Sequence, residues 1–204
     1  MIEKALNLAN QAHSGQTRKG TNIAYILHPM ESGVIASSIL TQLARYDEEV
    51  ISAAILHDVI EDTDVTEDYL LTKFNKKTVD LITVQSEDKS KSWKERKQAT
   101  IDCLNNTQDI DVKIVHLADK LSNMRSIARD YAMLGDKLWE RFNEKSKSEQ
   151  GWYYKSLAES LVDLKNTREH QEFKRLIKEV FIKWLNIQKE PLEGSFLLFI
   201  KFSD

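Results

Sequence analysis

The stretch from Val50 to Asp64 (VISAAILHDVIEDTD) restricts the fold more than any other, because an apolar helical run leads directly into five ionisable side chains. A buried charge is costly unless it is paired or bound to a metal ion, so the fold must compensate these groups. Positions four apart share one face of a helix, so a single helix through the stretch stacks His57 with Glu61. It also stacks Asp58 with Asp62. The alternative interpretation is a solvated helix end with a histidine packed in the core.

Helical periodicity dominates the rest of the sequence, which contains two prolines and six glycines among 204 residues. Apolar residues recur at helical spacing in most segments, which predicts an all-α helical bundle. A chain of this length most simply forms a single domain with one core. Residues that commonly cap helices also predict where several helices begin. These capping positions are Asp47, Thr66, Ser92 with Glu95, and Asp109 or Asp111.

The C-terminal part is predicted to form a long helix over residues 149–167 and another over residues 171–187. We find no repeat or linker that divides the chain, and we assign residues 1–190 to one domain. Residues 191–204 (PLEGSFLLFIKFSD) form an apolar, aromatic tail, for which the alternatives are a strand, a docking arm or an oligomer contact. Residues 85–91 (QSEDKSK) are polar, which predicts an exposed loop.

Charge and composition argue against several classes of function. The net charge of −3 gives no global attraction to nucleic acid or to an anionic membrane. No apolar run approaches the length of a membrane span, and the N-terminal segment lacks the apolar core of a secretion signal. The single cysteine, Cys103, allows no intrachain disulfide and fits a reducing compartment. We therefore expect a cytoplasmic protein with a small-molecule partner.

Candidate metal ligands lie in segments that loops separate. They are His28, His57, Asp58 and Asp119. Two imidazoles and two carboxylates suit a borderline divalent ion such as Mn²⁺, Fe²⁺ or Zn²⁺, whereas Ca²⁺ prefers oxygen ligands alone. Asp119, Asn123 and Ser126 fall on one helical stripe, so they are predicted to face the same cavity.

Four motifs occur together in this sequence. They are Ala12-His13-Ser14-Gly15-Gln16-Thr17-Arg18-Lys19, Tyr25-x-x-His28-Pro29, His57-Asp58-x-x-Glu61-Asp62-Thr63 and Leu117-Ala118-Asp119-Lys120-x-x-Asn123. Their order and spacing resemble the HD-type hydrolase domain of RelA/SpoT proteins. The length of the chain makes it most similar to the stand-alone small alarmone hydrolases, a group that includes the metazoan SpoT homologue. The resemblance covers about residues 2–129.

This resemblance implies an HD-domain helical bundle that holds a single Mn²⁺ ion. The ligands that it implies are His28, His57, Asp58 and Asp119. Glu61 and Asp62 match the acidic pair that activates or positions the water. The implied reaction removes the 3′-pyrophosphate from (p)ppGpp and gives GDP or GTP and pyrophosphate.

The resemblance also implies four contacts to the nucleotide. Arg18 matches a residue that packs on the guanine base, with Lys19 beside it. Asn123 matches a polar contact, and Ser126 stands where the family often has threonine. The family often has lysine where this chain has His116, so a local charge is lost or made dependent on pH.

A very anionic substrate requires local cations, and several basic residues flank the candidate site. Lys120 and Arg125 lie off the Asp119 stripe and are either part of the site or surface charge. Arg96 and Lys97 either bind phosphate or lie on a solvated helix face. Tyr25 either contacts the nucleotide or supports the turn at His28, and we favour support.

Two other functions remain open from the sequence. The same metal site could remove phosphate from another nucleotide, such as NADPH or a nucleoside monophosphate, because a fold does not fix a substrate. Alternatively, the chain is a non-enzymatic module that binds a nucleotide or a partner through its apolar tail. We expect no alarmone synthesis, because the chain is too short to add a second catalytic domain.

Overall fold

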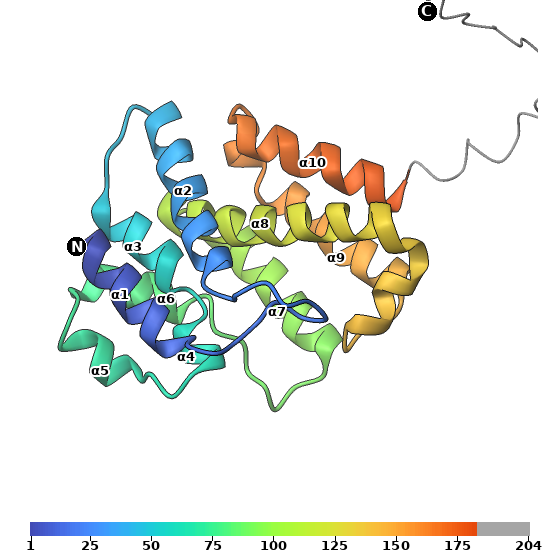
Figure 1. The fold of residues 1–204 in the computed structure, drawn as a ribbon. Coiled ribbons are helices and arrows are strands. Elements are labelled where there is room, and N and C mark those ends of the chain that lie inside the picture. Colours follow the sequence, from blue (N-terminus) through green and yellow to red (C-terminus); the bar gives the residue numbers. More distant parts are fainter. Residues whose placement is uncertain (183–204) are drawn as a thin grey trace, which may run out of the picture.

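The computed structural model describes residues 1–182, which form a helical bundle without any β-strand (Figure 1). An isolated bridge pairs Thr17 with Ala24 in the loop after the first helix. The prediction of a single all-α domain is therefore confirmed. The helices are α1 (Ile2–Ala12), α2 (Leu27–Gln42), α3 (Glu48–Leu56), α4 (Val59–Asp62), α5 (Glu67–Leu71), α6 (Lys76–Thr83), α7 (Trp93–Asn106), α8 (Ile110–Leu134), η1 (Gly135–Arg141), α9 (Lys147–Ser160), η2 (Val162–Leu164) and α10 (Arg168–Phe181).

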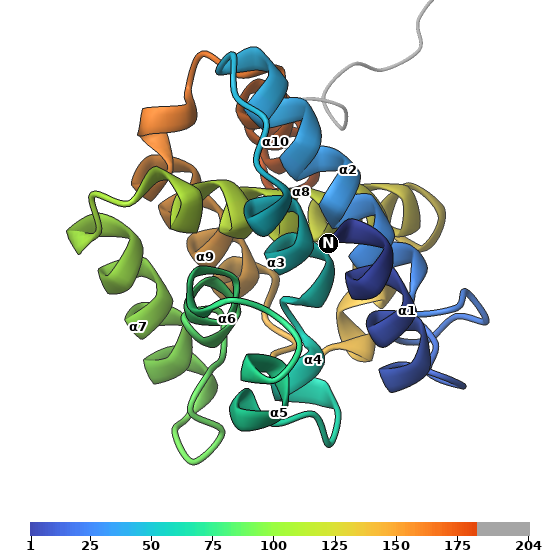
Figure 2. The same cartoon turned by 90° about the vertical axis from the view of Figure 1, so that its left-hand side faces the viewer.

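Two helices form the centre of the bundle. Every residue of α3 from Val50 to Leu56 is buried, which explains why all of them except Ser52 are apolar. Figure 2 shows α3 between α1 and α2 on one side and α6 on the other. The 25-residue helix α8 crosses the middle of Figure 1, with α2 and α10 packed along it. Within residues 1–182, no helix combines the length and apolar character needed to cross a bilayer.

The predicted helix starts are confirmed by hydrogen bonds from capping side chains. Asp47 accepts from two backbone amides at the start of α3, and Thr66 accepts from one, that of Tyr69, at the start of α5. Ser92 and Glu95 form both halves of the predicted capping box at the start of α7. Of the two alternatives for α8, Asp109 is the residue that caps the helix.

The prediction of one continuous helix through His57 and Glu61 is wrong. The helix is broken between Leu56 and Val59, where Asp58 has φ −97° and ψ −5°. Adjacent residues on a regular helix do not face each other. In the broken segment, by contrast, Asp58 Oδ2 lies 2.9 Å from His57 Nε2. The break therefore brings two neighbouring side chains to the same point.

The predicted helix over residues 149–167 is wrong at its C-terminal end. The helix α9 ends at Ser160, whose hydroxyl donates to the carbonyl of Ser156, a local bond that competes with helix continuation. The short turn η2 then carries Leu161 and Leu164 into the core. Residues 183–204, which contain the end of the predicted helix over residues 171–187 and the tail over residues 191–204, lie outside the described part of the chain.

Candidate active site

Four polar side chains converge at the centre of the bundle. His28 begins α2, His57 and Asp58 occupy the break after α3, and Asp119 lies in α8. His28 Nε2 is 3.1 Å from His57 Nε2 and 3.3 Å from Asp119 Oδ1. Asp58 Oδ2 lies 3.5 Å from the same His28 nitrogen. The structure therefore brings together all four predicted metal ligands, and His28, His57 and Asp119 are buried.

In each imidazole, the nitrogen that points away from the other ring, Nδ1, already has a hydrogen-bond partner. These partners determine whether the four side chains can bind a metal ion. His57 Nδ1 donates to the carbonyl of Ala54 at 2.8 Å. His28 Nδ1 lies 2.8 Å from Ser122 Oγ, and that hydroxyl donates to Glu31. Both Nε2 atoms are then left with lone pairs that face each other at 3.1 Å. Such an arrangement requires a positive charge between the rings, and a divalent metal ion fits the donor set.

The electrostatics of the cluster also favour a cation. Burial alone lowers the pKa of His57, but Asp58 and Asp119 raise it well above its usual value. Burial likewise opposes ionisation of Asp119, yet Lys120 and His57 hold the pKa of this carboxyl well below its usual range. Lys120 is half-buried and its Nζ lies 2.5 Å from the buried Asp119 Oδ2, so its interpretation as surface charge is wrong.

The two predicted catalytic acids lie beside this cluster on α4. Glu61 and Asp62 line a polar cavity of about 170 Å³ together with Asp58 and Asp119. Burial raises the pKa of Glu61, and the nearby carboxylates raise it further. Asp62 Oδ1 is 3.2 Å from Lys89 Nζ, at the solvent side of the cavity. The acids are thus placed to hold water next to the four converging side chains.

A second cavity, of about 280 Å³, adjoins the first. The residues that line both cavities are Tyr25, Lys97, Lys120 and Asn123. Arg18, Lys19, Asn123 and Ser126 all line the larger cavity, so the four predicted nucleotide contacts lie together.

A short hydrogen-bond path joins the larger cavity to the four converging side chains. Arg18 donates to Asn123 Oδ1 at 2.6 Å, and the amide of Asn123 donates to Asp119 Oδ1 at 2.6 Å. The Arg18 guanidinium also lies over the ring of Tyr25, at 5.5 Å from its centroid. Lys19 Nζ donates to Asn143 Oδ1 at 3.0 Å, which joins the loop after α1 to the segment after η1. The walls of the cavity come from the loop after α1, from α7, α8 and α9, and from η1.

The prediction of an exposed loop over residues 85–91 is wrong in its first half. Glu87 is largely buried at the smaller cavity, where it pairs with Arg96 at 3.0 Å and with Lys97 at 2.6 Å. Burial opposes its ionisation, but Lys97, Lys120 and Arg96 hold the pKa of Glu87 below its usual value. Arg96 and Lys97 are consequently not on a solvated helix face. The sequence carries no clear signal for Glu87, because polar loop residues are usually exposed.

The structure also shows residues that support the converging side chains. Tyr25 donates to Asp58 Oδ2 at 2.5 Å, so it contacts the candidate ligand Asp58 itself rather than only the turn at His28. Ser122, which contacts His28 Nδ1, could not be recognised from any pattern in the sequence. His116 is buried, and burial and Lys120 lower its pKa to about 4, so this side chain is neutral near pH 7.

Comparisons with known proteins agree with this geometry. A family model described as HD domain matches residues 5–145. The guanosine-3′,5′-bis(diphosphate) 3′-pyrophosphohydrolase of Vibrio cholerae is 38% identical over 131 residues, which are 62% of this chain and 18% of that protein. The matched part of this chain therefore spans less than a fifth of the length of that relative.

Two solved structures share the fold. The protein lmo0812 from Listeria monocytogenes superposes with a TM-score of 0.66 and 29% identity, over 76% of this chain and 98% of its own. A metazoan ortholog of SpoT superposes with a TM-score of 0.69 and 22% identity, over 87% of this chain and 94% of its own. The family model covers more than half of the sequence, and the chain belongs to the HD domain family.

Proposed function

We propose that this protein hydrolyses ppGpp or pppGpp to GDP or GTP and pyrophosphate, with one Mn²⁺ ion held by His28, His57, Asp58 and Asp119. The observation that carries the proposal is a cation-lined cavity that opens directly beside a buried cluster of two imidazoles and two carboxylates. The activities for which relatives are named support it. The Vibrio cholerae protein is named for this reaction, and the metazoan ortholog of SpoT is described as hydrolysing ppGpp.

The charge and the rings of the larger cavity suit a nucleotide with many phosphates. Its lining holds one carboxylate, Asp130, and six cationic side chains, which favours a polyanion. The cations are Arg18, Lys19, Lys97, Lys120, Arg129 and Arg141. Tyr25, Trp93, Phe142, Tyr153 and Tyr154 also line the cavity. Aromatic faces and arginine planes are the groups that stack on bases.

The chain's own residues then have distinct tasks. When bound, the ion supplies positive charge for the phosphoryl oxygens and acidifies a water molecule. Glu61 and Asp62 orient that water and accept its proton. The water oxygen bonds to the phosphorus attached to O3′, the O3′–P bond breaks, and a proton reaches O3′ of the departing nucleotide. Arg18, Lys19, Asn123 and Ser126 hold the nucleoside so that this phosphorus faces the acids.

The test is to incubate the purified protein with ppGpp and Mn²⁺ and to measure pyrophosphate release. We expect wild-type turnover and a loss of about a thousandfold in Asp58→Ala, because a metal centre contributes several kcal/mol to such reactions. Asp80→Ala removes an exposed carboxylate from α6 and is the matched control. Equal rates in wild type and Asp58→Ala would refute the proposal. A higher kcat/KM for NADPH or a nucleoside monophosphate would refute the substrate alone.

A further inference from the structure

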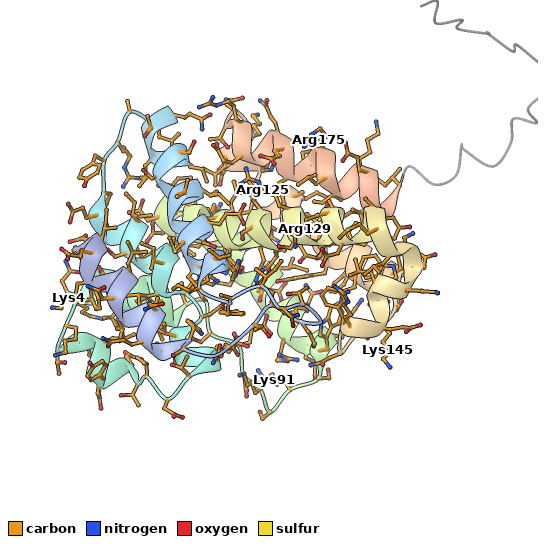
Figure 3. All side chains as sticks on the ribbon, viewed as in Figure 1. Lys4, Lys91, Arg125, Arg129, Lys145 and Arg175 are labelled. Atoms are coloured by element: carbon orange, nitrogen blue, oxygen red, sulfur yellow. The ribbon has the colours of Figure 1, made fainter. Side chains whose placement is uncertain are left out.

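The outer nitrogen of His28 is held by a chain of hydrogen bonds that crosses three helices. His28 Nδ1 lies 2.8 Å from Ser122 Oγ, which in turn lies 2.7 Å from Glu31 Oε2. Arg125 donates to the other oxygen of Glu31 at 2.9 Å. Arg125 also donates twice to Glu172 of α10, at 2.9 and 2.7 Å. Figure 3 shows Arg125 on α8, on the side that faces α10.

The direction of each hydrogen bond follows from the groups involved. A guanidinium only donates and an ionised carboxylate only accepts, so the single proton of the Ser122 hydroxyl goes to Glu31. The oxygen of Ser122 must then accept from His28, whose ring proton is therefore on Nδ1. Nε2 keeps its lone pair, which points at the other proposed metal ligands, His57 and Asp119. The carboxylate of Glu31 thus determines the tautomer of a ring that it does not touch.

The two imidazoles of the cluster differ in how they are held. His57 Nδ1 donates to the carbonyl of Ala54 in the preceding turn, so its tautomer is fixed by backbone alone. His28 and Ser122 are both buried, and the serine hydroxyl can either donate or accept. A second group is needed to decide between the two orientations, and Glu31 occupies that position.

We propose that Glu31 is a positioning residue of the metal centre. Acting through Ser122, it keeps His28 in the tautomer that presents Nε2 to the ion. Arg125 and Glu172 hold Glu31 in place, so α10 supports the centre without contributing a ligand. This inference rests on the metal centre of the proposed function, but it is independent of the substrate.

The substitution Glu31→Gln tests the proposal because it keeps the shape of the side chain and reverses the direction of its hydrogen bond with Ser122. Arg125 can only donate, so the amide oxygen of the new side chain faces Arg125 and the NH₂ group faces Ser122. Ser122 then accepts from the amide, so its own proton no longer goes to residue 31 and is free to turn towards His28 Nδ1. The ring proton moves to Nε2, where it competes with the ion. We expect Mn²⁺ binding to weaken by about 10–100-fold, the usual effect of losing such a support.

Glu172→Gln is the matched control, since it makes the same chemical change one link further from the metal. It leaves the hydrogen bond between Ser122 and Glu31 unchanged, so this variant should bind Mn²⁺ as the wild type does. Calorimetry gives the dissociation constants, and thermal unfolding checks that both variants fold. Nitrogen chemical shifts of the His28 ring in the metal-free protein supply a second measurement. They should report an Nδ1–H tautomer in wild type and Glu172→Gln, and an Nε2–H tautomer in Glu31→Gln.

Three outcomes separate this inference from the proposed function. Unchanged Mn²⁺ affinity and an unchanged tautomer in Glu31→Gln overturn the inference. Equal losses of affinity in Glu31→Gln and Glu172→Gln also overturn it, because they reveal a merely structural ion-pair cluster. A wild-type protein that binds Mn²⁺ but leaves ppGpp intact overturns the proposed function alone, and the comparison of the two variants still stands.

Discussion

At the scale of single residues, the environment of Glu61 sets the pH at which the proposed base can act. Burial raises the pKa of Glu61, and Glu87 makes the largest electrostatic addition, followed by Asp58 and Asp62. Lys120 opposes this rise. A carboxylate accepts a proton only above its pKa, so activity should fall as pH drops through this raised value.

Glu87→Gln should therefore move the acid limb of the kcat profile to lower pH. The variant removes a negative charge that disfavours ionisation of Glu61, and it frees Lys97 and Arg96 from their partner. Both effects lower the pKa of Glu61. We expect a shift of roughly 0.5–1 pH unit, the usual size for one neighbouring charge in a partly buried site. Rates of pyrophosphate release measured across pH values give the result.

The control for this prediction is Glu159→Gln, which removes an exposed carboxylate from α9. Its profile should coincide with that of the wild type. An acid limb that stays in place in Glu87→Gln, or moves to higher pH, would contradict the assigned environment of Glu61.

Site residues with distinctive chemistry could be predicted from the sequence, whereas the residues that contact them and hold them in position could not. His28, His57, Asp58 and Asp119 combine residue types that bind metals with a recognisable order along the chain. Ser122, Glu31 and Glu87 are ordinary polar residues, and each acts only through a partner on another helix or loop. Glu31 lies three residues after His28 in α2, a spacing that places both on one helix face. No pattern within α2 indicates the serine on α8 that joins them.

At the scale of helices, the close approach of α2 and α3 determines the distance between the two imidazoles. Gly33 of α2 faces Ile55 of α3, and a Cβ atom at Gly33 would lie 2.5 Å from Ile55 Cγ1. Such a contact cannot persist, so one helix or the isoleucine must shift. His28 lies near the start of α2 and His57 follows the end of α3. A shift between these helices therefore changes the geometry of the proposed metal site.

Gly33→Ala should lower the free energy of unfolding by about 1–3 kcal/mol, the usual cost of overpacking a core. It should also weaken Mn²⁺ binding, because the two Nε2 atoms move apart. Urea denaturation and calorimetry measure the two effects. Adding Ile55→Ala removes the clashing atoms, so the double variant should lose less stability than the sum of the single losses.

Gly151→Ala provides the comparison for Gly33→Ala. A Cβ atom at Gly151 would lie 3.1 Å from Phe181, between α9 and α10, which contribute none of the four converging side chains. This variant can change stability, but its Mn²⁺ affinity should match the wild type. If the stability losses of Gly33→Ala and Ile55→Ala simply add in the double variant, and Gly33→Ala leaves the Mn²⁺ affinity unchanged, the role given to the contact between Gly33 and Ile55 is contradicted.

Helix starts were more predictable than helix interruptions. Asp47 and Ser92 cap their helices through hydrogen bonds to amides within three residues, so the sequence carries the complete signal. The break at Asp58 has no such local signal, and the bond from the Ser160 hydroxyl to Ser156 at the end of α9 is one that serines also make inside helices. The break positions Asp58 for His57 and Tyr25, which are contacts that exist only in the folded bundle.

At the scale of the whole molecule, the candidate site depends on segments far apart along the chain. Arg18 and its partner Asn123 are 105 residues apart, and the larger cavity extends to Tyr154 on α9. The fold class and the shared location of the predicted residues followed from periodicity and motifs. The lining of the larger cavity could not be predicted in detail, because the side chains that η1 and α9 contribute to it follow no distinctive sequence pattern.

We propose that one divalent ion, held by side chains of α2, α8 and the break after α3, enables hydrolysis of ppGpp. The most direct test is to titrate metal-stripped protein with Mn²⁺ and to measure bound metal and pyrophosphate release on the same preparation. We predict that turnover rises in proportion to bound Mn²⁺ and saturates at about one ion per chain. Full turnover by the stripped protein, or no turnover by chains that each hold one ion, would contradict the claim.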